Sequence, residues 1–177
     1  MGRFEGEVIV KKNRRDVYGY LMDLQTRSAF MPTDWSHFRL TSVNPSGVGA
    51  TLEFDVAGAK PVKGLFILTG VLPPEGITEL GHIGDVKWTL RYSLDERDDG
   101  STAIRMIIEY TVASLLKMPL DRFVYAPMVQ RWHTAILQRL QRALDGESSA
   151  ETAARTARHA STYVGAQHGA VVPESAA

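Results

Sequence analysis

The chain has 177 residues, in which 20 Lys and Arg are balanced by 20 Asp and Glu, and it contains no cysteine. Its length allows one domain with a sizeable core, followed by a tail. The zero net charge argues against nucleic acid and anionic membranes as partners. The lack of cysteine excludes disulfides, thiolate zinc sites and cysteine nucleophiles. Because no secretory signal and no transmembrane run can be recognised, we expect a cytoplasmic protein.

The first part of the chain predicts one strand and two short helices. Residues 4–10 alternate in polarity and are rich in β-branched side chains, which is typical of a strand. Asn13 is a suitable N-cap for a helix. The apolar residues after it recur at helical spacing, namely Val17, Tyr20, Leu21 and Leu24. A second short helix is expected over residues 26–31, where Pro32 ends it.

The middle of the chain predicts six further strands joined by tight turns. They are expected over residues 37–43, 50–56, 62–72, 77–80, 86–94 and 102–112. In the second of these segments, apolar residues alternate with Glu53 and Asp55, which indicates one buried and one solvated face. The turn at Asp98, Asp99 and Gly100 is typical of a hairpin. We therefore expect an antiparallel sheet of about seven strands.

The longest predicted element is a helix over residues 120–144. One side of it carries the apolar stripe Val129, Trp132, Ile136, Leu140 and Ala143. Such a stripe is expected to pack on the sheet. Pro127 lacks the amide that would bond to the carbonyl of Phe123, so we expect either a kink or a new helix beginning at Pro127.

We place a domain at residues 1–146 and a tail at residues 147–177. Gly146 is a natural stop for the long helix. The residues after it are rich in alanine, serine, threonine and charge, with few large apolar side chains. This composition predicts a mostly disordered tail.

The order of these elements, supported by a few local motifs, resembles a known superfamily. The motifs are Phe4-Glu5-Gly6-Glu7-Val8 in the first strand, Trp35 after the short helices, Gly47-Val48-Gly49-Ala50 before the third strand, and Asp99-Gly100-Ser101-Thr102 before the last strand. Residues 3–145 are similar to the START and polyketide-cyclase-like superfamily, which shares its fold with the birch-pollen-type allergens. The resemblance implies an α+β helix-grip fold, in which a curved antiparallel sheet wraps around the C-terminal helix.

The resemblance also implies a cavity between the sheet and the long helix, which members use for lipids, sterols, polyketide intermediates, quinones or hormones. We therefore predict that the chain binds a hydrophobic small molecule. Two alternatives remain open: a cyclase or dehydratase that acts on a polyketide-like substrate, and a module that binds a protein partner. The sequence leaves the ligand, the presence of catalysis and the oligomeric state open, because function belongs to the site rather than to the fold.

The predicted cavity lining combines side chains from the helix stripe with those from the apolar parity of the strands. It comprises Trp35, Phe54, Leu68, Leu90, Tyr92, Met106, Ile108, Tyr110, Tyr125, Met128 and Trp132. Aromatic and aliphatic side chains with few polar groups are typical of small-molecule pockets.

Four residues are candidates for chemistry in that cavity: His133, Tyr92, Tyr110 and Arg122. His133 flanks the helix stripe and titrates near neutral pH, which suits general acid-base catalysis, although it could instead bond to a backbone carbonyl. The two tyrosine hydroxyls could orient a ligand oxygen or lie at the rim of the sheet. Arg122 could anchor a carboxylate or remain solvated.

No metal and no cofactor are expected from the sequence. The five histidines show none of the short spacings of a metal site. Glycines such as Gly47 and Gly49 lead into a strand rather than a helix, so they do not form a phosphate-binding loop.

Overall fold

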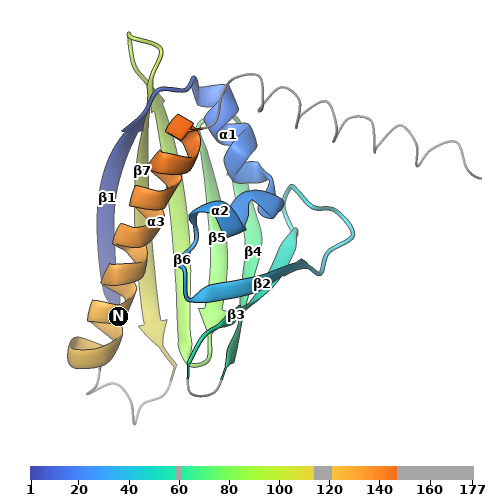
Figure 1. Cartoon of the computed structure of the whole chain (residues 1–177), viewed down its shortest axis with the longest axis vertical. Coiled ribbons are helices and arrows are strands. Elements are labelled where there is room, and N and C mark those ends of the chain that lie inside the picture. Colours follow the sequence, from blue (N-terminus) through green and yellow to red (C-terminus); the bar gives the residue numbers. More distant parts are fainter. Residues whose placement is uncertain (59–60, 114–120, 147–177) are drawn as a thin grey trace, which may run out of the picture. The chain divides into compact units, whose positions relative to one another are not determined.

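A computed structural model describes residues 1–58, 61–113 and 121–146 of the chain (Figure 1). The predicted tail, residues 147–177, lies outside these described residues, so its disorder and the boundary at residue 146 stay predictions. Residues 1–145 cluster into one compact unit.

Seven antiparallel strands form one sheet in the order β1-β7-β6-β5-β4-β3-β2. Their bounds are β1 Gly2–Val10, β2 Trp35–Leu40, β3 Thr51–Val56, β4 Val62–Leu72, β5 Gly76–Ile83, β6 Val86–Glu96 and β7 Thr102–Val112. From β2 to β7, each strand pairs with the next one in sequence. β1 forms the edge of the sheet beside β7, where Phe4 lies opposite Ile108. The predicted antiparallel sheet is confirmed.

Five strands differ from their predicted bounds: β1, β3 and β6 by one or two residues at one end, and β2 and β5 by more. The strand expected over residues 77–80 is longer, because β5 pairs with β6 all the way from Gly76 to Ile83. The strand expected over residues 37–43 begins earlier, at Trp35, and β2 ends at Leu40. In both cases the pairing partner, rather than the local pattern, sets the length.

The short helices follow β1, as expected. Helix α1 spans Arg14–Met22, and the side-chain oxygen of Asn13 caps it by accepting a hydrogen bond from the Asp16 amide at 3.0 Å. The second predicted helix is a 3₁₀ turn, η1 (Leu24–Thr26), that runs directly into α2 (Arg27–Phe30). Helix α1 packs on β5 and β6, so these helices cover one end of the sheet's inner face (Figure 1).

The long helix α3 spans Ala126–Gly146 and lies along the inner face, in front of β1 and β7 in Figure 1. A π-helical turn, η3 (Asp121–Tyr125), precedes it. Of the two alternatives for Pro127, the structure shows a new α-helix, which starts one residue earlier than predicted. The stripe residues Val129, Trp132, Ile136 and Leu140 are buried, and Ala143 is half-buried against the core.

Candidate functional site

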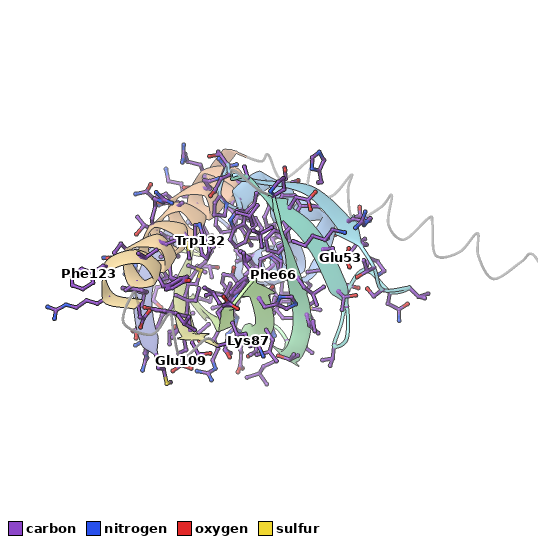
Figure 2. All side chains as sticks on the ribbon, turned by 90° about the horizontal axis from the view of Figure 1, so that it is seen from below. Glu53, Phe66, Lys87, Glu109, Phe123 and Trp132 are labelled. Atoms are coloured by element: carbon purple, nitrogen blue, oxygen red, sulfur yellow. The ribbon has the colours of Figure 1, made fainter. Side chains whose placement is uncertain are left out.

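A cluster of five aromatic rings occupies the space between the inner face of the sheet and α3. The rings belong to Trp35, Phe54, Phe66, Trp88 and Trp132, and we call them the aromatic cluster. Trp35 stacks on Phe54 with ring centroids 4.5 Å apart and meets Trp132 edge-on at 5.2 Å. In Figure 2, Trp132 on α3 and Phe66 on β4 face the same interior. The cluster therefore joins the helix to the sheet across the core.

Two glycines on the inner face set the orientation of two rings of the aromatic cluster. Phe54 lies directly opposite Gly64, and Trp88 lies opposite Gly81. A Cβ atom added to Gly64 would come within 2.2 Å of the Phe54 ring, and one added to Gly81 would come within 2.4 Å of the Trp88 ring. The rings therefore lie against the neighbouring strand and turn their faces to the interior.

The structure brings the predicted cavity-lining residues together in one core. Nine of them are buried, namely Trp35, Phe54, Leu68, Leu90, Tyr92, Met106, Ile108, Tyr110 and Trp132. The other two, Tyr125 and Met128, are partly buried and pack against the same core. These residues contact one another, and their role as a ligand-binding lining stays a prediction.

His133 is buried where α3 meets β7. Its Nε2 lies 3.2 Å from the carbonyl oxygen of Met106, so the imidazole donates a hydrogen bond there. Burial lowers the pKa of His133, and the bond to Met106 opposes this shift. The geometry is the backbone-bonded alternative considered above. It leaves the other ring nitrogen, Nδ1, for any further interaction.

The remaining catalytic candidates lie in three different environments. Arg122 is exposed on η3. Tyr110 is buried and hydrogen-bonds to the carboxylate of Asp121; burial and this bond raise the pKa of Tyr110 to about 12. Tyr92 is fully buried on β6, the strand on which α1 packs. The structure therefore does not gather Arg122, His133 and the two tyrosines around one point.

A fully buried ion pair lies next to Tyr92, and the sequence analysis missed it. Arg27, the first residue of α2, donates from Nη2 to the Oε1 atom of Glu79 on β5, and neither side chain is exposed. Burial raises the pKa of the Glu79 carboxyl, and Arg27 opposes this rise. The available signal was parity, because Glu79 alternates in phase with the buried Ile77.

Two hollows flank α3 in the described part of the chain. One, of about 470 Å³, lies between residues 32–34 and α3 and has Trp132 in its wall. The other, of about 330 Å³, lies between β1 and α3 and includes Phe4 and His133.

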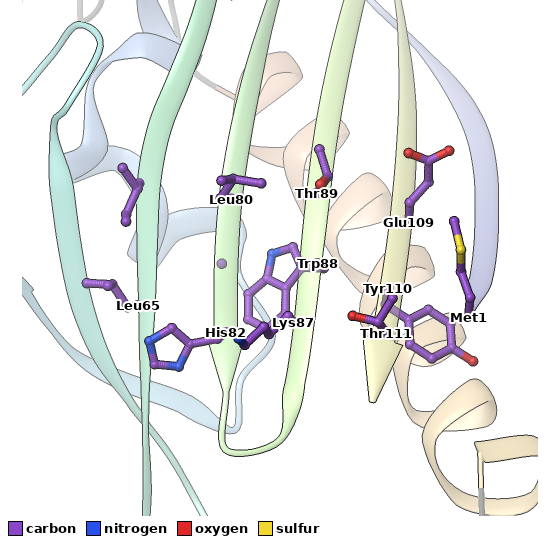
Figure 3. A pocket seen from close by; sticks show the side chains of 12 residues that line it. Met1, Leu65, Leu80, His82, Lys87, Trp88, Thr89, Glu109, Tyr110 and Thr111 are labelled. Atoms are coloured by element: carbon purple, nitrogen blue, oxygen red, sulfur yellow. The ribbon is translucent and has the colours of Figure 1, made fainter. Parts of the chain in front are cut away.

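A third hollow, of about 410 Å³, lies on the outer face of the sheet, away from α3 (Figure 3). Two rows of side chains that lie opposite one another in the strand register form its walls. These rows are Thr111, Lys87, His82 and Leu65, and Glu109, Thr89, Leu80 and Ile67. Met1, Gly81, Trp88 and Tyr110 line it as well, so one member of the aromatic cluster, Trp88, also borders this hollow.

Comparison with known proteins shows the fold. Protein TTHA0849 from Thermus thermophilus superposes with a TM-score of 0.67 at 13% identity, covering 84% of this chain and all of that one. The KanY protein superposes with a TM-score of 0.63 at 14% sequence identity, covering 82% of this chain and 99% of its own. Ara h 8.0201, a birch-pollen-allergen-like protein, superposes with a TM-score of 0.62 at 12% sequence identity, covering 82% of this chain and 99% of its own.

The chain has the helix-grip fold. The expected resemblance to the START and polyketide-cyclase-like superfamily is thus confirmed at the level of fold. No family model and no curated protein matches the sequence. At identities of 12 to 14%, the shared helix-grip fold carries no ligand or reaction from these neighbours to this chain.

No three His, Cys, Asp or Glu side chains in that part of the chain gather as a metal site requires. No helix within the same residues is long and apolar enough to span a membrane.

Proposed function

We propose that this helix-grip protein binds a hydrophobic small molecule between the inner face of the sheet and α3, against the aromatic cluster. One observation carries the proposal: Trp132 belongs to the aromatic cluster and also forms part of the wall of the hollow beside residues 32–34. A molecule that enters this hollow meets the edge of an interior lined with aromatic faces.

The chemistry of the lining supports an apolar, ring-containing or long-chain ligand. Large aromatic side chains supply much contact area for such molecules. The indole nitrogens of Trp35 and Trp132 are buried and have no hydrogen-bond partner among the described residues. Each of these N–H groups can donate to an oxygen on an otherwise apolar molecule. The superfamily that the sequence resembles uses the same space for lipids and polyketide intermediates.

The distribution of tryptophan makes the proposal testable by fluorescence. All three tryptophans of the chain belong to the aromatic cluster. N-phenyl-1-naphthylamine, an apolar probe that accepts energy from tryptophan, should bind saturably with one molecule per chain and quench the indole emission. Ala135→Phe, which adds a phenyl ring to the wall of the hollow, should weaken this binding by about tenfold, the equivalent of one well-buried contact.

A matched control on the other side of the sheet distinguishes binding beside α3 from binding to the outer face. Leu80 is half-exposed in the outer hollow, so Leu80→Gln should leave the affinity for the probe unchanged. If Leu80→Gln abolishes binding while Ala135→Phe has no effect, the probe binds the outer face and the proposal is wrong. Absence of any saturable binding would contradict it as well.

The other expectations from the sequence stay predictions. These are a cyclase or dehydratase activity, a protein partner and a cytoplasmic location. A reaction on a polyketide-like substrate needs polar groups that converge on the bound molecule. Of the catalytic candidates, His133 already donates a hydrogen bond from Nε2 to the Met106 carbonyl, so only its Nδ1 atom could act on such a substrate.

A further inference from the structure

A buried ion pair and a buried tyrosine form one group of three residues. Arg27 on α2, Glu79 on β5 and Tyr92 on β6 have exposed fractions of 0, 0 and 2%. Tyr92 and Glu79 are diagonal neighbours on adjacent strands, since Glu79 pairs with Leu90 and Tyr92 lies two residues further along β6. The Arg27 guanidinium also donates to the Leu21 carbonyl at 2.8 Å and lies 5.1 Å from the centre of the Phe30 ring.

Several polar atoms of this group are buried without a partner. They are Nε and Nη1 of Arg27, Oε2 of Glu79 and the hydroxyl of Tyr92, and none has a hydrogen-bond partner within the described ranges. Buried polar atoms in folded proteins are almost always hydrogen-bonded. Four such atoms belong to three neighbouring side chains, so a polar group from outside the chain would meet both donors and an acceptor here.

The chemistry of these atoms selects the class of group that fits. Arg27 and Tyr92 offer donors, while Glu79 offers an acceptor. The ion pair as a whole carries no net charge, so a buried anion would be repelled by Glu79 and a buried cation by Arg27. A hydroxyl group satisfies both sides, because its oxygen accepts from a donor while its hydrogen is donated to the carboxylate.

We propose that Arg27, Glu79 and Tyr92 form a polar site that binds a hydroxyl group of the hydrophobic ligand. The inference rests on the proposed function, because it places one end of the same ligand. Helix α2 supports this placement: it carries Arg27 on its buried side and leads directly into residues 32–34, which border the hollow beside Trp132.

Tyr92→Phe is the sharpest test, because it removes one unpartnered oxygen and changes nothing else in shape. The probes are 2-naphthol and naphthalene, which differ by one hydroxyl, and their affinities are measured by isothermal titration calorimetry. In Tyr92→Phe the ratio of the two affinities should shift against 2-naphthol by about five- to tenfold, the usual effect of one hydrogen bond. Tyr18→Phe, a half-buried tyrosine on α1 outside the site, should leave the ratio unchanged.

The double variant Arg27→Met, Glu79→Leu tests the pair without leaving a single buried charge. Replacing a buried ion pair by apolar residues of similar volume is often tolerated, and a thermal melt checks that the variant folds. It should keep its affinity for naphthalene and lose its relative affinity for 2-naphthol. An unchanged ratio in both variants would overturn the proposal and leave water as the partner of these atoms. If neither probe binds the parent protein, the hydrophobic site itself is wrong.

Discussion

The indole ring of Trp88 lies flat against Gly81, its cross-strand partner. Two carbons of the ring are 2.4 Å from the position that a Cβ atom on Gly81 would occupy. No side chain at residue 81 can coexist with the present position of Trp88. The same relationship holds between Phe54 and Gly64, so glycine on the inner face sets the orientation of the aromatic cluster.

The contact predicts that Gly81→Ala lowers stability. The added methyl group must displace the Trp88 ring from its contacts, which should lower the free energy of unfolding by about 1 to 3 kcal/mol. Gly19→Ala is the matched control, because apart from the nearby backbone of α1 itself nothing lies within 4 Å of its Cβ position. There alanine should raise stability by up to about 1 kcal/mol through its helix propensity. Urea denaturation measures both, and equal effects at the two sites would refute the packing argument.

Trp132 should behave as a core residue in the absence of ligand. It is 4% exposed and contacts Trp35 and Trp88, so Trp132→Ala should lower the free energy of unfolding by about 3 to 5 kcal/mol. Phe123, which is 77% exposed on η3, provides the comparison. Its replacement by alanine should change the urea midpoint little. A cost below about 1 kcal/mol at Trp132 would show that its surroundings are loosely packed.

The environment of His133 predicts a loss of stability in mild acid. Burial holds the pKa of His133 below its ordinary value, so the unfolded chain takes up a proton at a pH where the folded chain does not. Stability from this residue is therefore present above the unfolded pKa and decreases as the pH falls from about 7 towards the folded pKa. The thermal midpoint of the parent should drop more between pH 7.5 and 5.5 than that of His133→Gln, which cannot titrate. Parallel pH profiles would contradict this assignment.

Pro127 lies in the first turn of α3, where its missing amide removes no intrahelical hydrogen bond. Pro127→Ala should therefore change stability by about 0.5 to 1 kcal/mol at most. Gln138→Pro, an exposed position in the middle of the same helix, should instead cost about 3 kcal/mol or more. Circular dichroism and urea unfolding distinguish the two variants. A large loss at Pro127 would mean that the π-helical turn before it is coupled to α3.

Local chemistry was sufficient to predict much of the fold. Strands β4 and β7 have the predicted bounds, because alternation and the flanking turn residues are encoded within each segment. The Asn13 cap and the buried stripe of α3 were also foreseen, since capping and amphipathic spacing involve residues a few positions apart. The order of these segments, together with the resemblance to the superfamily, predicted the helix-grip fold. The predicted lining included three rings of the aromatic cluster but not Phe66 and Trp88.

Long-range contacts decided what that interior looks like. No local pattern could show that Trp88 lies on Gly81, that His133 bonds to the Met106 carbonyl or that Glu79 meets Arg27, because these partners come from different elements. The sequence could place Glu79 in phase with apolar residues, but the buried partner 52 positions away was visible only once α2 lay over β5. Burial and pairing of polar groups depend on which surfaces the fold brings together, and only the tertiary structure determines that.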